Sequence, residues 1–322
     1  MKKQNDQPIL TIGIPTYNRP DDLLRLLQQI AGSEVVLKEC CVLVIDDGSS
    51  GLNEDFLDEK NLPLNFLEHK LQYVKNHQNI GYPRTFIRLF EECRTDYLLI
   101  LSDDNLLLED GFLKAVEHVK LLRPSFMSSP WMQGGGIAHR TWKRNSPDTV
   151  IGVADFFRSS DHAPGLIYEC AKAKKYLNAI ESRIALRCSF TAVFPQVNLA
   201  LNLILHEDNC RYFAKPIGTE NSLRPSGIKD SSGQDWRTYR SLLRQAADLD
   251  EYISTFPATA EKKKINIGAQ KYYLNYFFKL VDPEVEKFFQ IFFTNRFLFT
   301  KTLSRLKSPL KSIGRSVKKV FG

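Results

Sequence analysis

The sequence predicts an α/β fold, with a mainly parallel sheet flanked by helices, followed by a helical C-terminal extension. Over the first 125 residues, short apolar runs alternate with longer segments of helical periodicity. Repeated strand–helix–strand units of this kind build open parallel sheets with right-handed crossovers. From residue 236 onward the periodicity is helical, so we expect an α/β domain over residues 1–235 and the extension over 236–322.

Composition and proline mark the first strand and the first helix. Residues 10–14 form a short apolar run that ends at Pro15, which suits a buried parallel strand. A helix is expected to begin at Pro20, because proline fits the first helical position and the carboxylates of Asp21 and Asp22 favour the positive end of the helix dipole. The later elements expected on the same grounds are strands at 41–45, 71–74, 97–101, 165–168 and 211–217, and helices at 83–90, 106–122 and 197–205.

The composition is that of a globular protein, with 43% hydrophobic and 25% charged residues. No run of 18 apolar residues predicts a transmembrane helix, and the polar start of the chain predicts no secretory signal, so we expect a cytoplasmic protein. The net charge of +7 originates at the C-terminal end. Nine of the 44 basic residues follow Glu286, where no acidic residue occurs, and the other 35 are balanced by 37 acidic ones. A nucleic-acid-binding body is therefore not expected.

Polar clusters follow three of the predicted strands. They are Pro15-Thr16-Tyr17-Asn18-Arg19, Asp46-Asp47-Gly48-Ser49 and Ser102-Asp103-Asp104-Asn105. In open α/β sheets the carboxyl ends of the strands form the edge that binds ligands, so we expect the three clusters to meet there. Each cluster alone is also explained as a turn or a helix cap, but their joint occurrence at three strand ends favours a binding site.

The residue types in these clusters suit a nucleotide-sugar and a divalent metal. Tyr17 can stack on a base, and Asp46 or Asp47 can accept a hydrogen bond from a base or a ribose. A pyrophosphate needs positive charge, which Mg²⁺ or Mn²⁺ held by one or two carboxylates supplies. The Asp103-Asp104 pair is the expected holder, and the metal would stabilise the departing nucleoside diphosphate.

These ordered motifs resemble those of family 2 glycosyltransferases with the GT-A fold, a Rossmann-like α/β arrangement. The resemblance rests on residues 14–19, 44–50, 79–81 and 101–105, covers residues 9 to about 125 well, and extends more loosely to about 220. It implies inverting transfer from a nucleotide-sugar donor with Mg²⁺ or Mn²⁺. Within the family, the chain is most similar to transferases acting on O-antigen or lipooligosaccharide, including those for dideoxy sugars.

The resemblance also implies residue roles. The residues that would bind the nucleotide are Pro15, Thr16, Tyr17, Asn18, one carboxylate of Asp46-Asp47, Asn79, Gly81 and Arg84. Asp103 would approach the ribose or the sugar as a catalytic residue, and Asp104 would ligate the metal. Asn105 stands at the third place of the family's Asp-x-Asp motif, which is often acidic, and is a second candidate ligand.

The catalytic base departs from the family pattern. Inverting transfer needs a carboxylate that deprotonates the acceptor hydroxyl, and the family often carries Glu-Asp at the start of a late helix. Here that helix begins near Pro195-Gln196, which cannot serve as a base. Asp208 is the preferred candidate, with Asp161, His206 and Glu207 as alternatives. The missing carboxylate also leaves open a catalytically inactive relative that acts as a nucleotide- or membrane-binding scaffold.

The C-terminal tail has the pattern of a basic amphipathic helix. Apolar residues recur every three or four positions from Phe299 to Val320, and the basic residues fall mostly off this stripe. Such a segment suits a membrane surface that carries anionic lipids; a helix packed on the body with its charges in water, or a coiled-coil seam, is the alternative. We therefore expect a peripheral protein on the inner face of the plasma membrane. Its expected acceptor is a glycan such as a lipid-linked O-antigen, lipooligosaccharide or capsule intermediate.

Overall fold

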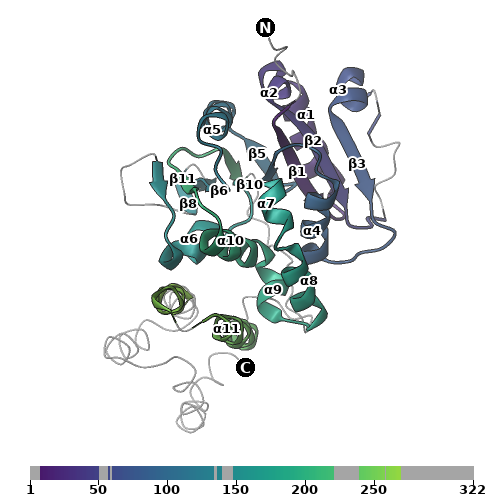
Figure 1. Cartoon of the computed structure of the whole chain (residues 1–322). Helices are drawn as coiled ribbons and strands as arrows, with labels where there is room; N and C mark the ends of the chain where they lie inside the picture. The colour runs from purple at the N-terminus through teal and green to yellow at the C-terminus, as the bar shows by residue number, and fades with distance from the viewer. Residues whose placement is uncertain are drawn as a thin grey trace.

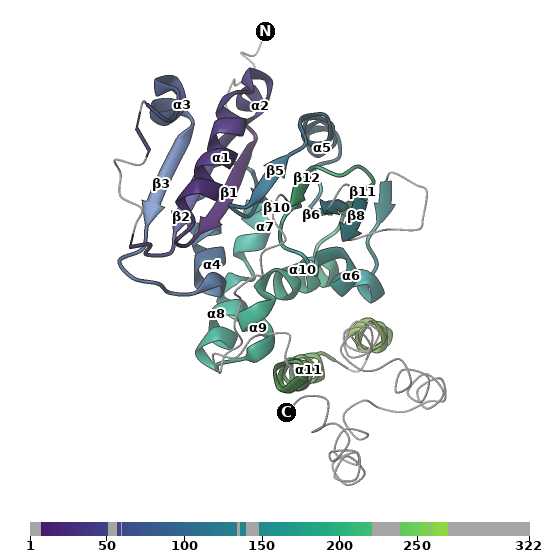
Figure 2. The same ribbon diagram turned by 180° about the vertical axis from the view of Figure 1, so that it is seen from behind.

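The structure of the chain is a computed structural model. It describes residues 8–50, 57–58, 60–133, 136–139, 148–220, 239–257 and 259–269. In these residues a twisted central sheet carries helices on both faces (Figures 1 and 2), which confirms the predicted fold class. Within the described stretches, no helix is both long and apolar enough to span a membrane. The predicted amphipathic stripe from Phe299 to Val320 lies outside the described residues.

The central sheet is parallel in its first half and mixed in its second. Its strands are β1 (Leu10–Thr16), β2 (Cys40–Asp46), β3 (Leu71–Lys75), β4 (Tyr97–Ile100), β6 (Phe126–Ser128), β9 (Asp148–Val150), β10 (Leu166–Glu169) and β11 (Cys210–Phe213). Among the described residues, their spatial order is β3-β2-β1-β4-β10-β6-β11-β9. Strands β3, β2, β1 and β4 pair in parallel, as do β6 and β11. Strand β10 runs antiparallel between β4 and β6, and β9 is an antiparallel strand at the edge.

The reversal of β10 decides which residues meet at the edge of the sheet. The parallel strands β1, β2, β4 and β6 all end at one edge, called here the carboxyl edge. Because β10 runs the other way, its first residues lie at that same edge, and the Gly165 N–H donates to the carbonyl oxygen of Ile100 at 2.8 Å. The loop before β10 therefore joins the loops that follow the parallel strands.

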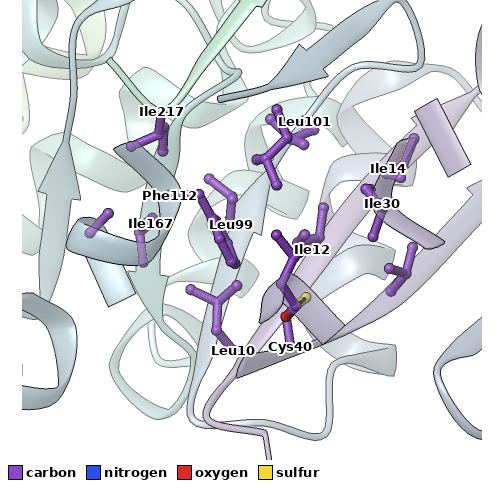
Figure 3. Close-up of a cluster of buried hydrophobic side chains, with 14 of the residues drawn as sticks. Leu10, Ile12, Ile14, Ile30, Cys40, Leu99, Leu101, Phe112, Ile167 and Ile217 are labelled. Carbon is purple, nitrogen blue, oxygen red and sulfur yellow. Dashed lines mark hydrogen bonds between the residues drawn. The ribbon is translucent and has the colours of Figure 1, made fainter. Parts of the chain in front are cut away.

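Alternate residues of the strands feed two apolar cores, one on each face, as expected for a sheet covered on both sides. One face is covered by α1 (Pro20–Ala31), α2 (Glu34–Glu39), α3 (Leu64–His69) and α5 (Glu109–Leu122). Figure 3 shows part of this core, where Ile12 and Leu99 lie near Ile30 and Phe112. The opposite face is covered by α4 (Tyr82–Glu92), α7 (Cys170–Lys174), α8 (Leu177–Ala185) and α10 (Pro195–His206).

A second, smaller sheet forms beyond the end of β4. It consists of β5 (Asn105–Leu107), β12 (Gly218–Glu220), β7 (Trp131–Gln133) and β8 (Gly136–His139), and the described strands lie in the order β5-β12-β7-β8. Two predictions were wrong here. The helix expected at 106–122 begins only at Glu109, because Leu106 and Leu107 pair with β12. The strand expected at 211–217 ends at Phe213 as β11, and β12 begins only at Gly218, after Pro216, which has no N–H to donate.

The first helix of the extension packs against the α/β body. Helix α11 (Tyr239–Ser254) and a helical segment at 260–269 share a third apolar core with η2 (Val153–Asp155), α6 (Phe156–Ser160), α9 (Ser189–Val193) and α10. The carboxylate of Asp248 in α11 accepts the N–H groups of Ser189 and Phe190 at 2.5 and 3.3 Å. The body and α11 are thus joined by apolar packing and by hydrogen bonds.

Candidate active site

The three polar clusters come together at the carboxyl edge. The N–H of Asp47 donates to the carbonyl oxygen of Thr16 at 2.9 Å, which ties the end of β2 to the end of β1. The N–H of Asn18 donates to the Ser49 hydroxyl at 2.7 Å. The Thr16 hydroxyl donates to Oδ2 of Asp103 at 2.8 Å, which joins β1 to the loop after β4. The ends of three neighbouring strands therefore form one connected polar site.

Asp103 and Asp104 lie on either side of a single positive charge. Nη1 of Arg19 lies 3.1 Å from Oδ1 of Asp103 and 3.3 Å from Oδ2 of Asp104. Burial raises the pKa of Asp103 to about 6, although Arg19 and the Thr16 hydroxyl both favour the carboxylate. For Arg19, burial alone would lower the pKa, but the charges of Asp103 and Asp104 outweigh it and raise the pKa. The sequence motif contained Arg19, but its role as the partner of both carboxylates was not predicted.

Asp46 is fully buried and fastens the turn that follows β2. Its Oδ1 accepts hydrogen bonds from the Ser49 N–H at 2.9 Å and from the Ser49 hydroxyl at 2.5 Å. Its Oδ2 accepts a hydrogen bond from the Tyr73 hydroxyl at 2.7 Å and lies 3.9 Å from Nζ of Lys75. The side chain of Asp46 therefore shapes the site from beneath its surface.

Asp47 fastens the neighbouring loop, which leads into α4. Its carboxylate accepts the Asn76 side-chain amide at 2.8 Å, the Ile80 N–H at 2.8 Å and the Gly81 N–H at 2.9 Å. Gly48 allows this close approach: its φ is +76°, and a Cβ there would lie 2.5 Å from the carbonyl carbon of Gln78. The turn after β2 and the loop after β3 are consequently packed backbone against backbone.

The loop that Asp47 fastens, together with the start of α4, contains residues that were predicted to lie over the nucleotide. Oδ1 of Asn79 accepts the Gly81 N–H at 3.0 Å, and Gly81, with φ of +85°, turns the chain into α4. Arg84 is exposed in the first turn of that helix. The contacts of Asp47 thus bring Asn79, Gly81 and Arg84 to the same edge of the sheet as the three clusters.

The loop after β1 presents an aromatic ring to solvent. Pro15 is held within β1, opposite Ile45 of β2. Tyr17 is 45% exposed. Asn18 has φ of +53°, and its Oδ1 accepts the Ser50 N–H at 3.1 Å, which fixes the turn beside Tyr17. The ring of Tyr17 is therefore open to a planar ligand at a site whose backbone is fixed.

Asn105 does not have the role expected of a metal ligand. Its side chain is buried, and its Oδ1 accepts the Ser102 N–H at 2.7 Å. Its Nδ2 donates to Oδ1 of Asp104 at 3.3 Å. The amide holds the turn after β4 and orients Asp104, so its oxygen is already engaged by the backbone. In the part of the chain that the structure describes, no group of three or more His, Cys, Asp or Glu residues could hold a metal ion.

Asp208 lies at the other edge of the sheet. Its carbonyl oxygen accepts the hydroxyl of Ser125, and Ser125 and Asn209 directly precede the parallel strands β6 and β11. Helix α10 runs from the carboxyl edge back to the opposite edge, where these strands begin. The structure therefore does not bring Asp208 together with Asp103. Glu207, which accepts hydrogen bonds from Lys175 and Tyr176, and His206, which stacks on Tyr176, lie in the same turn.

The loop that contains Asp161 and His162 is at the carboxyl edge. It leads into β10, and the carbonyl oxygen of Asp161 accepts the side-chain amide of Gln196, at the start of α10, at 3.4 Å. Nε2 of His162 lies 3.3 Å from Oε1 of Glu220. Glu220 was missed from sequence because it ends a three-residue strand without any motif. Only its pairing with Asn105 in the ladder of β12 and β5 reveals its position.

Comparisons with known proteins agree with this architecture. The family model described as Glycosyl transferase family 2 matches residues 11–176, just over half of the chain. Abequosyltransferase RfbV of Salmonella typhimurium is 23% identical over 148 residues, which are 44% of this chain and 44% of that protein. The match thus spans less than half the length of this relative.

Solved structures share the fold at low identity. TarS 1-349 of S. aureus in complex with UDP-GlcNAc has a TM-score of 0.57 and 16% identity, with 84% of this chain and 72% of that chain covered. The mannosyltransferase PcManGT from Pyrobaculum calidifontis, in complex with GDP-Man and Mn²⁺, has a TM-score of 0.52 and 15% identity, with 95% and 81% covered. At these identities the likeness shows a shared fold.

Proposed function

The chain belongs to glycosyl transferase family 2, and we propose that it transfers a sugar, with inversion, from a nucleotide-sugar donor to a glycan acceptor. The proposal rests above all on the Asp103-Asp104 pair, which surrounds a positive charge at the edge where β1, β2 and β4 end. This is the edge at which open α/β sheets bind their ligands. The donors named for TarS and PcManGT, UDP-GlcNAc and GDP-Man, support a nucleotide-sugar for this chain.

The nucleotide is proposed to bind between the loop after β1 and the start of α4. The open ring of Tyr17 suits stacking on the base. Thr16, Asn18, Asp46 and Asp47 are proposed to frame the base and the ribose, largely through the backbone that they fix. Arg84, exposed on the first turn of α4, is a proposed phosphate partner.

The residues at the end of β4 suit Mg²⁺ or Mn²⁺. Mg²⁺ is usually held by one or two carboxylates together with substrate phosphates, so a pair of aspartates without a third protein ligand is sufficient. The side chain of Asp104 is 19% exposed and that of Asp103 is 5% exposed. Asp104 would therefore hold the metal, and Asp103 would face the ribose or the sugar. When bound, the metal supplies positive charge to the departing nucleoside diphosphate.

The partial similarity to an abequosyltransferase supports a hexosyl or deoxyhexosyl donor. The proposed acceptor is a lipid-linked glycan of O-antigen, lipooligosaccharide or capsule type. The family resemblance and the basic tail after Glu286 favour it. The tail would keep the protein at an anionic membrane on the cytoplasmic side, where such an acceptor would lie.

A thermal-shift panel tests the donor site. Purified protein would be heated with UDP, GDP, CDP or dTDP, each with and without Mn²⁺. We expect one nucleoside diphosphate to raise the melting temperature, and to do so more strongly with Mn²⁺, because a ligand that binds only the folded state stabilises it. No shift with any nucleotide, with or without metal, would contradict the proposed function.

A catalytically inactive scaffold is the second candidate, because Pro195-Gln196 stands where the family often carries Glu-Asp. The two functions differ in turnover. An enzyme should hydrolyse its nucleotide-sugar slowly in water without an acceptor, whereas a scaffold should bind the donor and leave it intact. Release of nucleoside diphosphate over hours would therefore favour the enzyme.

The tail has its own test. Each Lys or Arg close to an anionic leaflet contributes about 1 kcal/mol, so a few engaged residues give measurable binding. Full-length protein should co-sediment with anionic liposomes, dissociate in high salt and bind neutral liposomes weakly. Deletion of residues 296–322 should abolish this binding and leave nucleotide binding unchanged. Equal sedimentation of the shortened protein would locate the membrane contact elsewhere, and its unfolding would indicate a helix packed on the body.

A further inference from the structure

An inverting transferase needs a proton acceptor on the sugar side of its metal pair, and two expected positions do not provide one. Gln196 stands at the start of α10 and is buried, with its amide turned to the carbonyl oxygen of Asp161. Asp208 lies at the opposite edge of the sheet, beside Ser125. Besides the two Asp-Asp pairs, the carboxyl edge offers Asp161, in the loop before β10, whose Oδ1 is buried, and Glu220, in β12.

Glu220 comes from the small sheet. In the antiparallel ladder of β12 and β5, Glu220 is paired with Asn105, the residue that directly follows the Asp103-Asp104 pair. Antiparallel partners of this kind have Cα atoms about 4.5–5.5 Å apart. Figure 2 shows β5 and β12 side by side at the centre of the molecule. The pairing thus places Glu220, from a strand more than one hundred residues later, opposite the residue that follows the proposed metal pair.

One side chain donates a hydrogen bond to the carboxylate of Glu220, and a second lies beside it. Nε2 of Gln133 in β7 donates to its Oε2 at 2.5 Å, and Nε2 of His162 lies 3.3 Å from its Oε1. His162 and Glu220 are 19% and 18% exposed, so both are anchored while part of each reaches solvent. A carboxylate oriented by an amide and an imidazole, and still accessible, has the features of a general base.

The position of His162 is fixed from two directions. The loop that carries it is tied to the end of β4 by the hydrogen bond from Gly165 to Ile100. Its ring packs against the fully buried ring of Trp131, with centroids 5.8 Å apart. Gly218 in turn fits against Trp131, because a Cβ at that position would lie 2.2 Å from the indole ring. The buried packing of Trp131 and Gly218 therefore fixes the ring of His162 beside β12.

We propose that Glu220 is the catalytic base and that His162 and Gln133 are its positioning residues; the proposal rests on the proposed function. The acceptor hydroxyl oxygen forms a bond to the anomeric carbon of the donor sugar, and its proton passes to the carboxylate of Glu220. The bond from the anomeric carbon to the diphosphate oxygen breaks, and its electron pair leaves with the nucleoside diphosphate. The acceptor hydroxyl is received between β12 and the loop before β10.

The decisive variant is Glu220→Gln, which keeps the shape and removes the charge. Transfer from the nucleotide-sugar should fall at least about 100-fold, while the thermal shift with nucleoside diphosphate and Mn²⁺ stays at the wild-type value. Glu181→Gln, on an exposed position of α8, is the matched control and should transfer at the wild-type rate. Near-normal transfer by Glu220→Gln overturns the assignment while the proposed function stands. Absence of any nucleotide binding by the wild-type protein overturns both.

If Glu220→Gln does not fold, two further variants test whether Glu220 is the catalytic base. Glu220→Asp retains the carboxylate on a shorter arm, and His162→Gln removes one positioning contact. Each should lower kcat about 10-fold or more and leave the KM for the donor unchanged, because the donor is bound by other residues. A structural role alone would instead raise the donor KM or lower the melting temperature, and wild-type kcat in both variants would overturn the proposal.

Discussion

The molecule contains two Asp-Asp pairs at the ends of the two strands that flank β1, and it uses them differently. Asp46 and Asp47, after β2, accept hydrogen bonds from backbone N–H groups, hydroxyls and an amide of their own and adjacent loops. Asp103 and Asp104, after β4, share the guanidinium of Arg19. The first pair is saturated by the protein, whereas the second already surrounds a positive charge. The same residue types at equivalent strand ends therefore have a structural role in one case and form a proposed cation site in the other.

Burial separates the two pairs in a second way. Asp46 and Asp47 are both buried among donors that fix the surrounding turns. Asp103 is also buried, but its pKa rises to about 6 because its donors do not compensate for the loss of solvent. A carboxylate held in this way favours an additional cation. The comparison teaches that the number of donors supplied by the protein, more than the motif itself, distinguishes a structural aspartate from a binding one.

The largest expected effect on ligand binding belongs to the second pair. Asp104→Ala should lower Mn²⁺-dependent affinity for the nucleoside diphosphate by roughly 100-fold, because a metal supplies several kcal/mol to a pyrophosphate. The free energy of unfolding without ligand should change by less than about 1 kcal/mol, since the losses are a part-exposed ion pair to Arg19 and a long hydrogen bond from Asn105. Titration calorimetry and urea unfolding measure the two quantities. Undiminished Mn²⁺-dependent binding would remove Asp104 from the metal site.

For the first pair, substitution should lower the free energy of unfolding, whereas for the second pair it should lower ligand affinity. Asp47→Ala leaves the Asn76 amide and the Ile80 N–H without their acceptor and leaves the Gly81 N–H with Asn79 alone, which should cost about 3 kcal/mol of unfolding free energy. Urea unfolding by circular dichroism gives this value directly. Asp21→Ala, on the exposed start of α1, is the control. Wild-type stability of Asp47→Ala would erase the distinction between the two pairs.

The smallest expected effect is on Mn²⁺ affinity and comes from the guanidinium of Arg19. If Arg19 occupies part of the space that a metal would take, Arg19→Gln should tighten Mn²⁺ binding to the nucleotide-free protein about threefold, since each part-exposed ion pair is worth less than 1 kcal/mol. Arg25→Gln, which removes an ion pair to Asp22 in α1, is the matched control. Free Mn²⁺ measured by electron paramagnetic resonance reports the change. Weaker binding in Arg19→Gln would mean that Arg19 supports the metal instead of competing with it.

The parts of the fold that could be predicted have local signals. Strands β1, β2 and β4 contain contiguous apolar runs followed by polar clusters, so both their existence and their common edge were predictable. Strands β5 and β12 have three residues each and form only because they pair across more than one hundred residues. The position of Glu220 therefore has no signal in its own neighbourhood.

Strand direction explains why Asp208 lies away from Asp103. Residues before a parallel strand lie at the amino edge, so the turn that contains Asp208, before β11, cannot reach Asp103. Residues before an antiparallel strand lie at the carboxyl edge, so the Asp161-His162 loop, before β10, can. The sequence predicts strands at both places but contains no clear mark of their direction, because both are short and apolar.

The capping of α9 by Asp248 bears on how such a protein can evolve. The apolar side of α11 fills a core that includes Phe157, Phe190 and Val197 from the body. A gene cut short before Tyr239 would encode a protein with these side chains bared and the first turn of α9 without its acceptor. Substitutions on the solvent-facing side of α11 should be tolerated, but a single early stop codon that removes the whole helix should not. Its loss would require simultaneous substitutions on the body to make the uncovered face polar.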